Sequence, residues 1–181
     1  MNFTELAKNR RSIRAYEARE INREELESCI EVARFSPSAC HSQPWRFVVV
    51  DDPATKNKIS ETFSGTYSMN TFARDAAAFV VIVAEKMKFP AWAGNKLRKT
   101  DFRRIDIGIA CAHIVLRARE LDIGTCILGW FNEKKLKKIL SVPYGKRIEL
   151  VISMGYPTNR EVPEKVLKDK AEVLGFNSYR L

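Results

Sequence analysis

The first third of the chain alternates between apolar and polar positions in patterns that predict a helix followed by a strand. Between Glu24 and Arg34, apolar residues recur every three or four positions, as on the buried face of an amphipathic helix. Asn22 precedes this run. Glu25 lies three residues after Asn22, which is the spacing of a capping box. Ser36-Pro37 ends the helix, and the apolar run 46–50 predicts a buried strand.

The middle of the chain holds its longest uncharged segments. A helix is predicted over 54–63 with Pro53 at its first position, then a loop over 65–70 and a fully buried strand over 76–84. A long helix is predicted from Asp101 to Leu121. Its central part, 107–116, is apolar nearly all round, which predicts burial on every side, in the core or at a dimer interface.

The remaining pattern predicts a strand over 123–128, a basic amphipathic helix over 133–140 and a strand over 147–154. Alternating helices and strands indicate an α/β or α+β class with a mixed or mainly antiparallel sheet. The 181 residues contain no repeat or linker, so we expect one domain over 1–157. Residues 158–181 are charged and carry few apolar side chains, and we expect this extension to pack on a partner subunit.

The net charge of +9 arises from 31 Lys and Arg against 22 Asp and Glu, and it favours anionic partners. The cations are dispersed and lack interleaved aromatic residues or a groove-reading motif, which argues against nucleic-acid binding. No uncharged run is long enough to span a bilayer, and the first residues are not typical of a secretory signal. We therefore expect a cytoplasmic protein that does not enter the membrane.

The four cysteines form no Cys-x-x-Cys pair, and the chain has only two histidines. This spacing gives no metal-ligand pattern. We expect reduced and mostly buried thiols, with Cys40 as the exception because it lies in a polar loop.

Two segments carry the candidate chemistry. Arg10–Arg14 combines three cations with a hydroxyl group, and 36–47 surrounds two prolines with small polar residues before the first strand. Together they suggest an anion pocket and a polar, backbone-rich wall, which a flat phosphorylated cofactor requires. Taken alone, each segment is also compatible with a basic surface patch or an ordinary proline turn.

Five segments, in this order, resemble the nitroreductase family of FMN-dependent flavoproteins. They are Arg10-Arg11-Ser12-Ile13-Arg14, Pro37-Ser38-Ala39-Cys40-His41-Ser42-Gln43-Pro44-Trp45, Asp106-x-Gly108-x-Ala110, the run 121–129 and Gly155-Tyr156-Pro157. The resemblance covers nearly the whole chain. It implies an α+β fold with a mixed, mainly antiparallel sheet flanked by helices, and a homodimer with the long central helix at the interface. It also implies FMN bound at two equivalent sites between the subunits.

The family's pattern also implies which residues hold FMN. Arg10, Ser12 and Arg14 would face its phosphate, ribityl and pyrimidine parts, because a guanidinium fork suits a phosphate. The proline loop would reach the FMN of the other subunit, and the run after Cys126 would offer backbone N–H groups near the reactive N5 atom. The implied set is Arg10, Arg11, Ser12, Arg14, Pro37, Ser38, Ala39, His41, Gln43, Asn70, Ile127, Leu128, Gly129 and Lys165, with Arg74 as a weaker candidate.

The sequence departs from the family's pattern at two positions beside the cofactor. The family usually has Asn where this chain has His41, and imidazole cannot supply the donor–acceptor pair of an amide. Some members carry Glu where this chain has Leu128, so no side chain there is expected to donate a proton. We name no catalytic acid or base.

Two further departures lie in the tail and before the central helix. Many members have Lys-x-Arg near the C-terminus, whereas Lys165 is followed by Leu167 two positions on. Lys168 or Arg160 is then needed to complete the phosphate site. The segment 86–100 is short, so we expect an open substrate site with an aromatic lining of Phe89, Trp92 and Trp130.

The resemblance implies an FMN-dependent NAD(P)H oxidoreductase that works by ping-pong hydride transfer, since the flavin carries the hard chemistry. NADH or NADPH would be the donor, and a small nitroaromatic, quinone or activated alkene the acceptor. One alternative is a specialised flavin reaction, such as reductive dehalogenation. Others are a flavin-binding or redox-sensing protein without efficient turnover, and a nucleic-acid-binding module. The sequence identifies neither the acceptor nor the preferred nicotinamide.

Overall fold

The computed structural model of the chain describes residues 2–159, 161 and 163–179. Its elements, in order, are α1 (Phe3–Asn9), α2 (Arg23–Arg34), η1 (Ala39–His41), β1 (Trp45–Val50), α3 (Pro53–Ser60), η2 (Glu61–Phe63), η3 (Gly65–Asp75), β2 (Ala78–Ala84), α4 (Phe89–Arg98), α5 (Phe102–Glu120), β3 (Gly124–Leu128), α6 (Glu133–Ile139), β4 (Arg147–Gly155) and α7 (Lys170–Val173). The elements labelled η are 3₁₀ helices.

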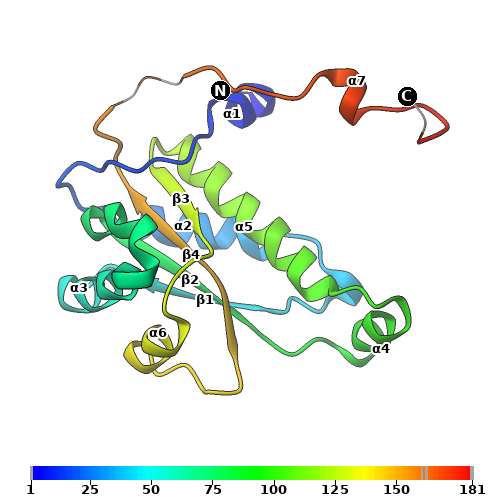
Figure 1. The fold of residues 1–181 in the computed structure, drawn as a ribbon, viewed down its shortest axis with the longest axis horizontal. Coiled ribbons are helices and arrows are strands. Elements are labelled where there is room, and N and C mark those ends of the chain that lie inside the picture. Colours follow the sequence, from blue (N-terminus) through cyan, green and yellow to red (C-terminus); the bar gives the residue numbers. More distant parts are fainter. Residues whose placement is uncertain (1, 160, 162, 180–181) are drawn as a thin grey trace.

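The strands form one antiparallel sheet in the order β1-β2-β4-β3. Helices α2 and α5 cover one face, and α3, η2, η3 and α6 lie on the other (Figure 1). The predicted α+β class with a mainly antiparallel sheet is confirmed. The mixed character is limited to an isolated parallel bridge between Ser12 and Thr125.

Strand β2 is buried along its whole length, as the apolar run predicted. Its side chains alternate between two hydrophobic clusters. Val80 and Ile82 pack with α2 and α5, whereas Phe79 and Val81 pack with α3, η2 and α6. The sheet therefore lies between two apolar cores, which holds its outer strands at fixed positions.

Local capping signals place the helix starts correctly. Asn22 and Glu25 form the predicted capping box at α2, and Asp52 caps α3, where Pro53 is the first residue. The long helix is confirmed as α5, flanked by Asp101 and Leu121.

Two sequence expectations about local structure were wrong. Residues 65–70 are not a loop but the first part of the 3₁₀ helix η3. Strand β1 is not buried, because it is an edge strand with Arg46 and Val49 exposed. A third expectation stays a prediction: a single chain covers α5 on one side only, since Gly108 and Ala112 are exposed, so burial on every side would need a dimer interface.

The Gly155-Tyr156-Pro157 motif fixes the chain segment that follows α1. Tyr16 packs so closely on the end of β4 that a Cβ at Gly155 would lie 2.7 Å from its ring, so no larger residue fits there. The Glu17 N–H donates to the Tyr156 carbonyl oxygen at 2.8 Å, and Arg19 lies over the Tyr156 ring at 3.8 Å. The motif thereby holds residues 10–16 against the sheet.

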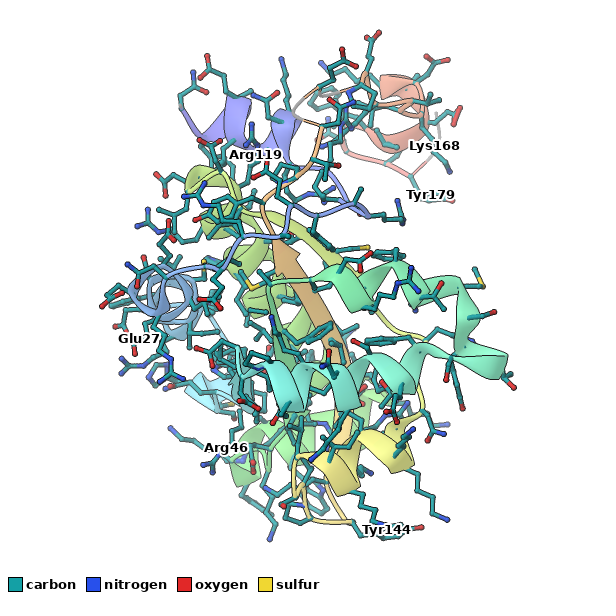
Figure 2. All side chains as sticks on the ribbon, turned by 90° about the vertical axis from the view of Figure 1, so that its left-hand side faces the viewer. Glu27, Arg46, Arg119, Tyr144, Lys168 and Tyr179 are labelled. Atoms are coloured by element: carbon teal, nitrogen blue, oxygen red, sulfur yellow. The ribbon has the colours of Figure 1, made fainter. Side chains whose placement is uncertain are left out.

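The C-terminal segment lies at the end of the molecule that carries α1 (Figure 1). In Figure 2, Lys168 and Tyr179 lie at the same end as Arg119, and Tyr144 lies at the opposite end. The apolar side chains of this segment are largely exposed, with Val166 and Tyr179 fully so. Within the described residues, no helix has both the length and the apolar character that crossing a bilayer requires.

Candidate functional site

The segment 10–14 runs beside the outer edge of β3. The Ile13 N–H donates to the Thr125 carbonyl oxygen at 2.9 Å, and Ser12 forms the parallel bridge to the same residue. A Cβ at Gly124 would lie 2.8 Å from the Ile13 side chain, so glycine is needed for this close approach. The cluster is thus placed by backbone pairing and not by its charges.

Arg10, Ser12 and Arg14 share one side of this extended segment, because alternate residues of a strand point the same way. We call these three residues the cationic face. They lie near Cys126, whose pKa is raised by burial, an effect that Arg14, the Ser12 hydroxyl and Arg10 oppose. The Arg14 guanidinium carbon also lies 5.9 Å from the centre of the Phe72 ring of η3.

A third cation joins Arg10 and Arg11 from the tail. The Lys165 ammonium donates to the Ala7 carbonyl oxygen at 2.7 Å, and the Arg11 guanidinium donates to the Pro163 carbonyl oxygen. The pKa of Lys165 is lowered by partial burial and by the positive charges of Arg10 and Arg11. Because these cations repel one another, a bound anion would reduce the electrostatic repulsion within the cluster.

None of the ion pairs within the described part of the chain involves Arg10, Arg11 or Lys165. The cavity that includes Arg10 and Arg11 is also lined by Asp122 and Glu161, and Asp122 pairs with Arg119. Cations that have no ion-pair partner can bind an anion. Lys168, which the sequence offered in place of the missing arginine of the Lys-x-Arg pattern, is exposed. Arg160 lies outside the described residues.

The edge of β3 provides backbone groups next to the cationic face. Beyond Thr125, this edge pairs with no other strand among the described residues, and the N–H groups of an unpaired edge can donate to a ligand. Ile127 is 43% exposed whereas Leu128 is 2% exposed. The Leu128 side chain therefore packs in the core. Since the Thr125 carbonyl faces the segment 10–14, strand alternation directs the backbone groups of Ile127 to the free edge and those of Leu128 towards β4.

Helix η3 forms a wall over the residues after β3. The Asn70 side-chain amide donates to the Trp130 carbonyl oxygen at 2.7 Å, and the Trp130 indole donates to the Thr66 carbonyl oxygen at 3.0 Å. The rings of Tyr67 and Trp130 lie 5.6 Å apart. The sequence analysis did not identify Tyr67 or Phe72 in the site, because their contacts with Trp130 and Arg14 join segments that are distant in sequence.

The proline loop has an unusual backbone. Cys40, His41 and Gln43 all have positive φ angles near 50°, a conformation that costs energy for residues other than glycine. The loop is held by the Gln43 N–H, which donates to the Ser38 hydroxyl at 2.9 Å. The Gln43 amide and the His41 Nε2 atom are also 2.9 Å apart. Side-chain contacts therefore fix this strained shape.

The Ala39 N–H anchors the loop to the start of α5, at 3.1 Å from the Asp106 carboxylate. Asp106 is 4% exposed, and its pKa is raised by burial, which the Ala39 bond partly opposes. The sequence pointed to Asp106 as part of a family motif but gave it no role. Its role is to hold the proline loop.

The chain does not bring the proline loop and the cationic face together. The loop is anchored at Asp106, and a cavity that includes Arg10 and Arg11 is lined by Arg119 near the other end of α5. Thirteen residues separate Asp106 from Arg119, which corresponds to about 20 Å along a helix. The predicted site residues therefore form two groups at opposite ends of α5 (Figure 1).

The three aromatic residues that were predicted to line the substrate site lie in two separate places. Trp130 belongs to the wall formed by η3, whereas Phe89 and Trp92 lie on α4, which contacts η1. The short segment before α5 carries helix α4 beside the proline loop, and the expected open substrate site stays a prediction. Arg74, a weak candidate, is exposed and lies 3.6 Å from Asp75.

Comparison with known proteins decides the family. The model of the nitroreductase family matches residues 7–70 and 67–156. The chain belongs to the nitroreductase family. A protein of Archaeoglobus fulgidus with the provisional name NADH dehydrogenase/NAD(P)H nitroreductase is 32% identical over 160 residues, which cover 84% of this chain and 83% of that protein.

Two other relatives of this nitroreductase-family protein bear on its chemistry. The iodotyrosine deiodinase of Haliscomenobacter hydrossis is 29% identical and aligns with 92% of this chain and 84% of its own length. The solved structure of an FMN-dependent nitroreductase from Clostridium difficile has a TM-score of 0.78 at 28% identity. That similarity covers 98% of this chain and all of the other.

The residues of this chain fit the FMN that the family uses. The cluster of Arg10, Arg11 and Lys165 has the charge that a phosphate requires, and the edge of β3 has backbone donors for a ring. Arg14 lies between that edge and Phe72, where it can face an electron-rich ring system. The proline loop would complete the site only from a second subunit.

Proposed function

We propose that the protein is a cytoplasmic, homodimeric FMN-dependent NAD(P)H oxidoreductase of the nitroreductase type. The observation that carries this proposal is the meeting of the cationic face, the unpaired edge of β3 and Lys165 at one place in a nitroreductase fold. When bound, FMN supplies hydride transfer from a nicotinamide to a nitroaromatic, quinone or activated alkene acceptor.

Arg10 and Lys165 hold the phosphate in this proposal. Arg10 is the better anchor, because a guanidinium can donate two parallel hydrogen bonds to phosphate oxygens. Lys165 acts as a point charge whose position depends on its bond to Ala7. Arg11 donates to Pro163 and so fixes the tail that carries Lys165. No Arg stands at Leu167 to add a second fork.

Arg14 and the edge of β3 hold the ring. The Arg14 guanidinium stabilises negative charge on the pyrimidine edge, and backbone N–H groups of Ile127 and Gly129 donate to the ring near its reactive atom. Asn70 supports this edge through its bond to the Trp130 carbonyl. No acidic or basic side chain is needed at these positions, so the protein contributes binding, orientation and electrostatics.

The second subunit supplies the proline loop. Helix α5 presents a surface of Ile105, Gly108, Ile109, Ala112 and Leu116 that is uncharged and at least partly exposed in one chain. Such a surface is typical of a subunit interface. A second copy on this surface would bring its loop and η1 to the cationic face of the first chain, and the tail would pack across the same partner.

Reductive dehalogenation is the second candidate, and it is favoured by the similarity to an iodotyrosine deiodinase. Helix α4 gives this candidate some support, since it places Phe89 and Trp92 beside the proline loop. The proposal of an FMN-dependent oxidoreductase holds for either acceptor, a nitroaromatic or a halogenated aromatic compound. Both candidates require the same flavin site.

The test is anaerobic reduction of the purified FMN-loaded protein. NADH or NADPH should bleach the flavin, and a nitroaromatic, a quinone or an iodinated phenol should restore its colour. Flavin that is bound but bleached by neither nicotinamide would favour a flavin-binding protein without turnover. Colourless protein that fails to bind added FMN would refute the proposal.

A further inference from the structure

A cavity of about 650 Å³ lies between α4 and the start of α5, outside the groups described above. Helix α4 stands at the edge of the molecule beyond the N-terminal end of α5 (Figure 1). The cavity is lined by Lys86, Met87, Trp92, Lys99, Thr100, Asp101 and Arg103. We call it the α4 pocket.

The α4 pocket has an excess of positive charge. It contains three cations and one carboxylate, and that carboxylate is already engaged. Asp101 lies 3.7 Å from Arg103 and 3.4 Å from Arg104. Lys86 and Lys99 have no carboxylate partner in the described part of the chain, and the buried Nε atom of Arg103 has no hydrogen-bond partner there. An anion would therefore find free donors.

The pocket also has a flat apolar wall. Trp92 is 50% exposed and its ring lies 5.8 Å from that of Phe89, which is 73% exposed. Exposed aromatic faces of this kind can stack on a planar ligand. Cations beside such a wall favour a ligand that is both aromatic and negatively charged.

The pocket is fixed to the proline loop. The Lys88 N–H donates to the Ser42 hydroxyl at 3.2 Å, and the Trp92 N–H donates to the Lys88 carbonyl oxygen at 3.0 Å. A direct hydrogen bond therefore joins the proline loop to the segment that begins α4. In the proposed dimer, the loop and the pocket stand beside the flavin site of the partner subunit.

We propose that the α4 pocket selects the electron acceptor, and that the preferred acceptor is an aromatic anion, such as an aromatic carboxylate. This inference rests on the proposed function and names the substrate class of the same site. It disfavours a zwitterionic amino acid, because residues 86–100 contain five Lys or Arg and no Asp or Glu. The one carboxylate of the pocket, Asp101, already pairs with Arg103 and Arg104, so an ammonium group would meet a net positive charge.

Equilibrium binding to the FMN-loaded protein tests the inference without turnover. The probes are para-nitrobenzoate and para-nitrobenzamide, which differ little in shape but by one charge. The carboxylate should bind about fivefold more tightly, since a partly exposed ion pair contributes up to about 1 kcal/mol. Raising the salt concentration should reduce this preference, because exposed charges are screened.

The double variant Lys86→Gln and Lys99→Gln should bind both probes equally, with its flavin content unchanged. The control is Lys58→Gln on α3, an exposed cation far from the pocket, which should keep the preference. Equal binding of the probes by the unmodified protein, or no binding of either, would overturn the inference. Failure of the proposed function is seen separately, as flavin that neither nicotinamide bleaches.

Discussion

The Asp106 carboxylate accepts a hydrogen bond from the Ala39 N–H at 3.1 Å, across 67 positions of the sequence. This one contact ties the strained proline loop to the central helix. It also means that a buried, ionisable group lies directly under a loop that we assign to the cofactor of the partner subunit. The stability of the loop should therefore depend on the charge of Asp106.

We predict a pH-dependent gain in stability from Asp106→Asn, which keeps an acceptor for Ala39. Burial raises the pKa of Asp106 in the folded protein, so ionisation of its carboxyl group reduces the stability of the fold. The stability contributed by the unmodified Asp106 thus falls as the pH rises through this raised pKa. The variant's advantage in Tm should be largest near neutral pH and vanish below the ordinary pKa of aspartate.

The matched control for this pH effect is Asp169→Asn, at an exposed position before α7 where the side chain makes no capping bond. Its Tm difference from the unmodified protein should show no comparable change over the same pH range. An advantage of Asp106→Asn that is independent of pH would show that its carboxylate is not destabilised by burial.

Arg10→Ala should weaken FMN binding by about ten- to a hundredfold, because a hydrogen bond to a charged group contributes about 1.5–3 kcal/mol. Riboflavin, which lacks the phosphate, should bind the variant and the unmodified protein alike. The control is Arg46→Ala on β1, an exposed cation at the other edge of the sheet (Figure 2). An equal loss for FMN and riboflavin would remove Arg10 from the phosphate site.

The tail offers a comparison within one short segment. Lys165→Ala should weaken FMN binding, because Lys165 adjoins Arg10 and Arg11. Lys168→Ala should not, because that side chain is exposed. Leu167→Arg should tighten binding by at most about 1–2 kcal/mol if its guanidinium reaches the phosphate. Titrations with FMN measure all three variants, and the opposite order for Lys165 and Lys168 would reassign the site.

Two substitutions on α5 separate folding from dimer formation. Ile114 is fully buried in the chain's own core, so Ile114→Glu should prevent folding. Ala112 is exposed in one chain, so Ala112→Glu should yield a folded monomer with little bound flavin. Ala54→Glu, at an exposed position on α3, should leave the dimer intact. A stable dimer of the Ala112 variant, seen by sedimentation, would contradict the interface on α5.

The features that the sequence predicted well depend on neighbouring residues. The capping box of Asn22 and Glu25 needs only a four-residue window, and the uniform apolar run of β2 requires burial on both faces. The exposure of β1 could not be predicted, because its place at the sheet edge follows from the order of strands distant in sequence. The role of Asp106 likewise depends on a contact with a distant loop.

In the candidate site, too, features set by neighbouring residues were predicted and features set by distant contacts were not. Its cations were recognisable as a cluster along the chain, and the cationic face follows from simple strand alternation. The wall formed by η3 was missed, because the contacts of Tyr67 and Phe72 join segments that are distant in sequence. The separation of the proline loop from Arg10 could not be read from local patterns, since the length and direction of α5 determine it.

The central claim is that each flavin site combines the cationic face of one subunit with the proline loop of the other. Mixed dimers test it most directly. A subunit carrying Arg10→Ala and Arg14→Ala is co-expressed with one carrying Gln43→Ala and Asp106→Ala, and the mixed dimer is purified through two different tags. The account predicts one intact site per mixed dimer and FMN occupancy near half, well above that of either parent dimer. Occupancy no higher than in the parent dimers would contradict a site shared between subunits.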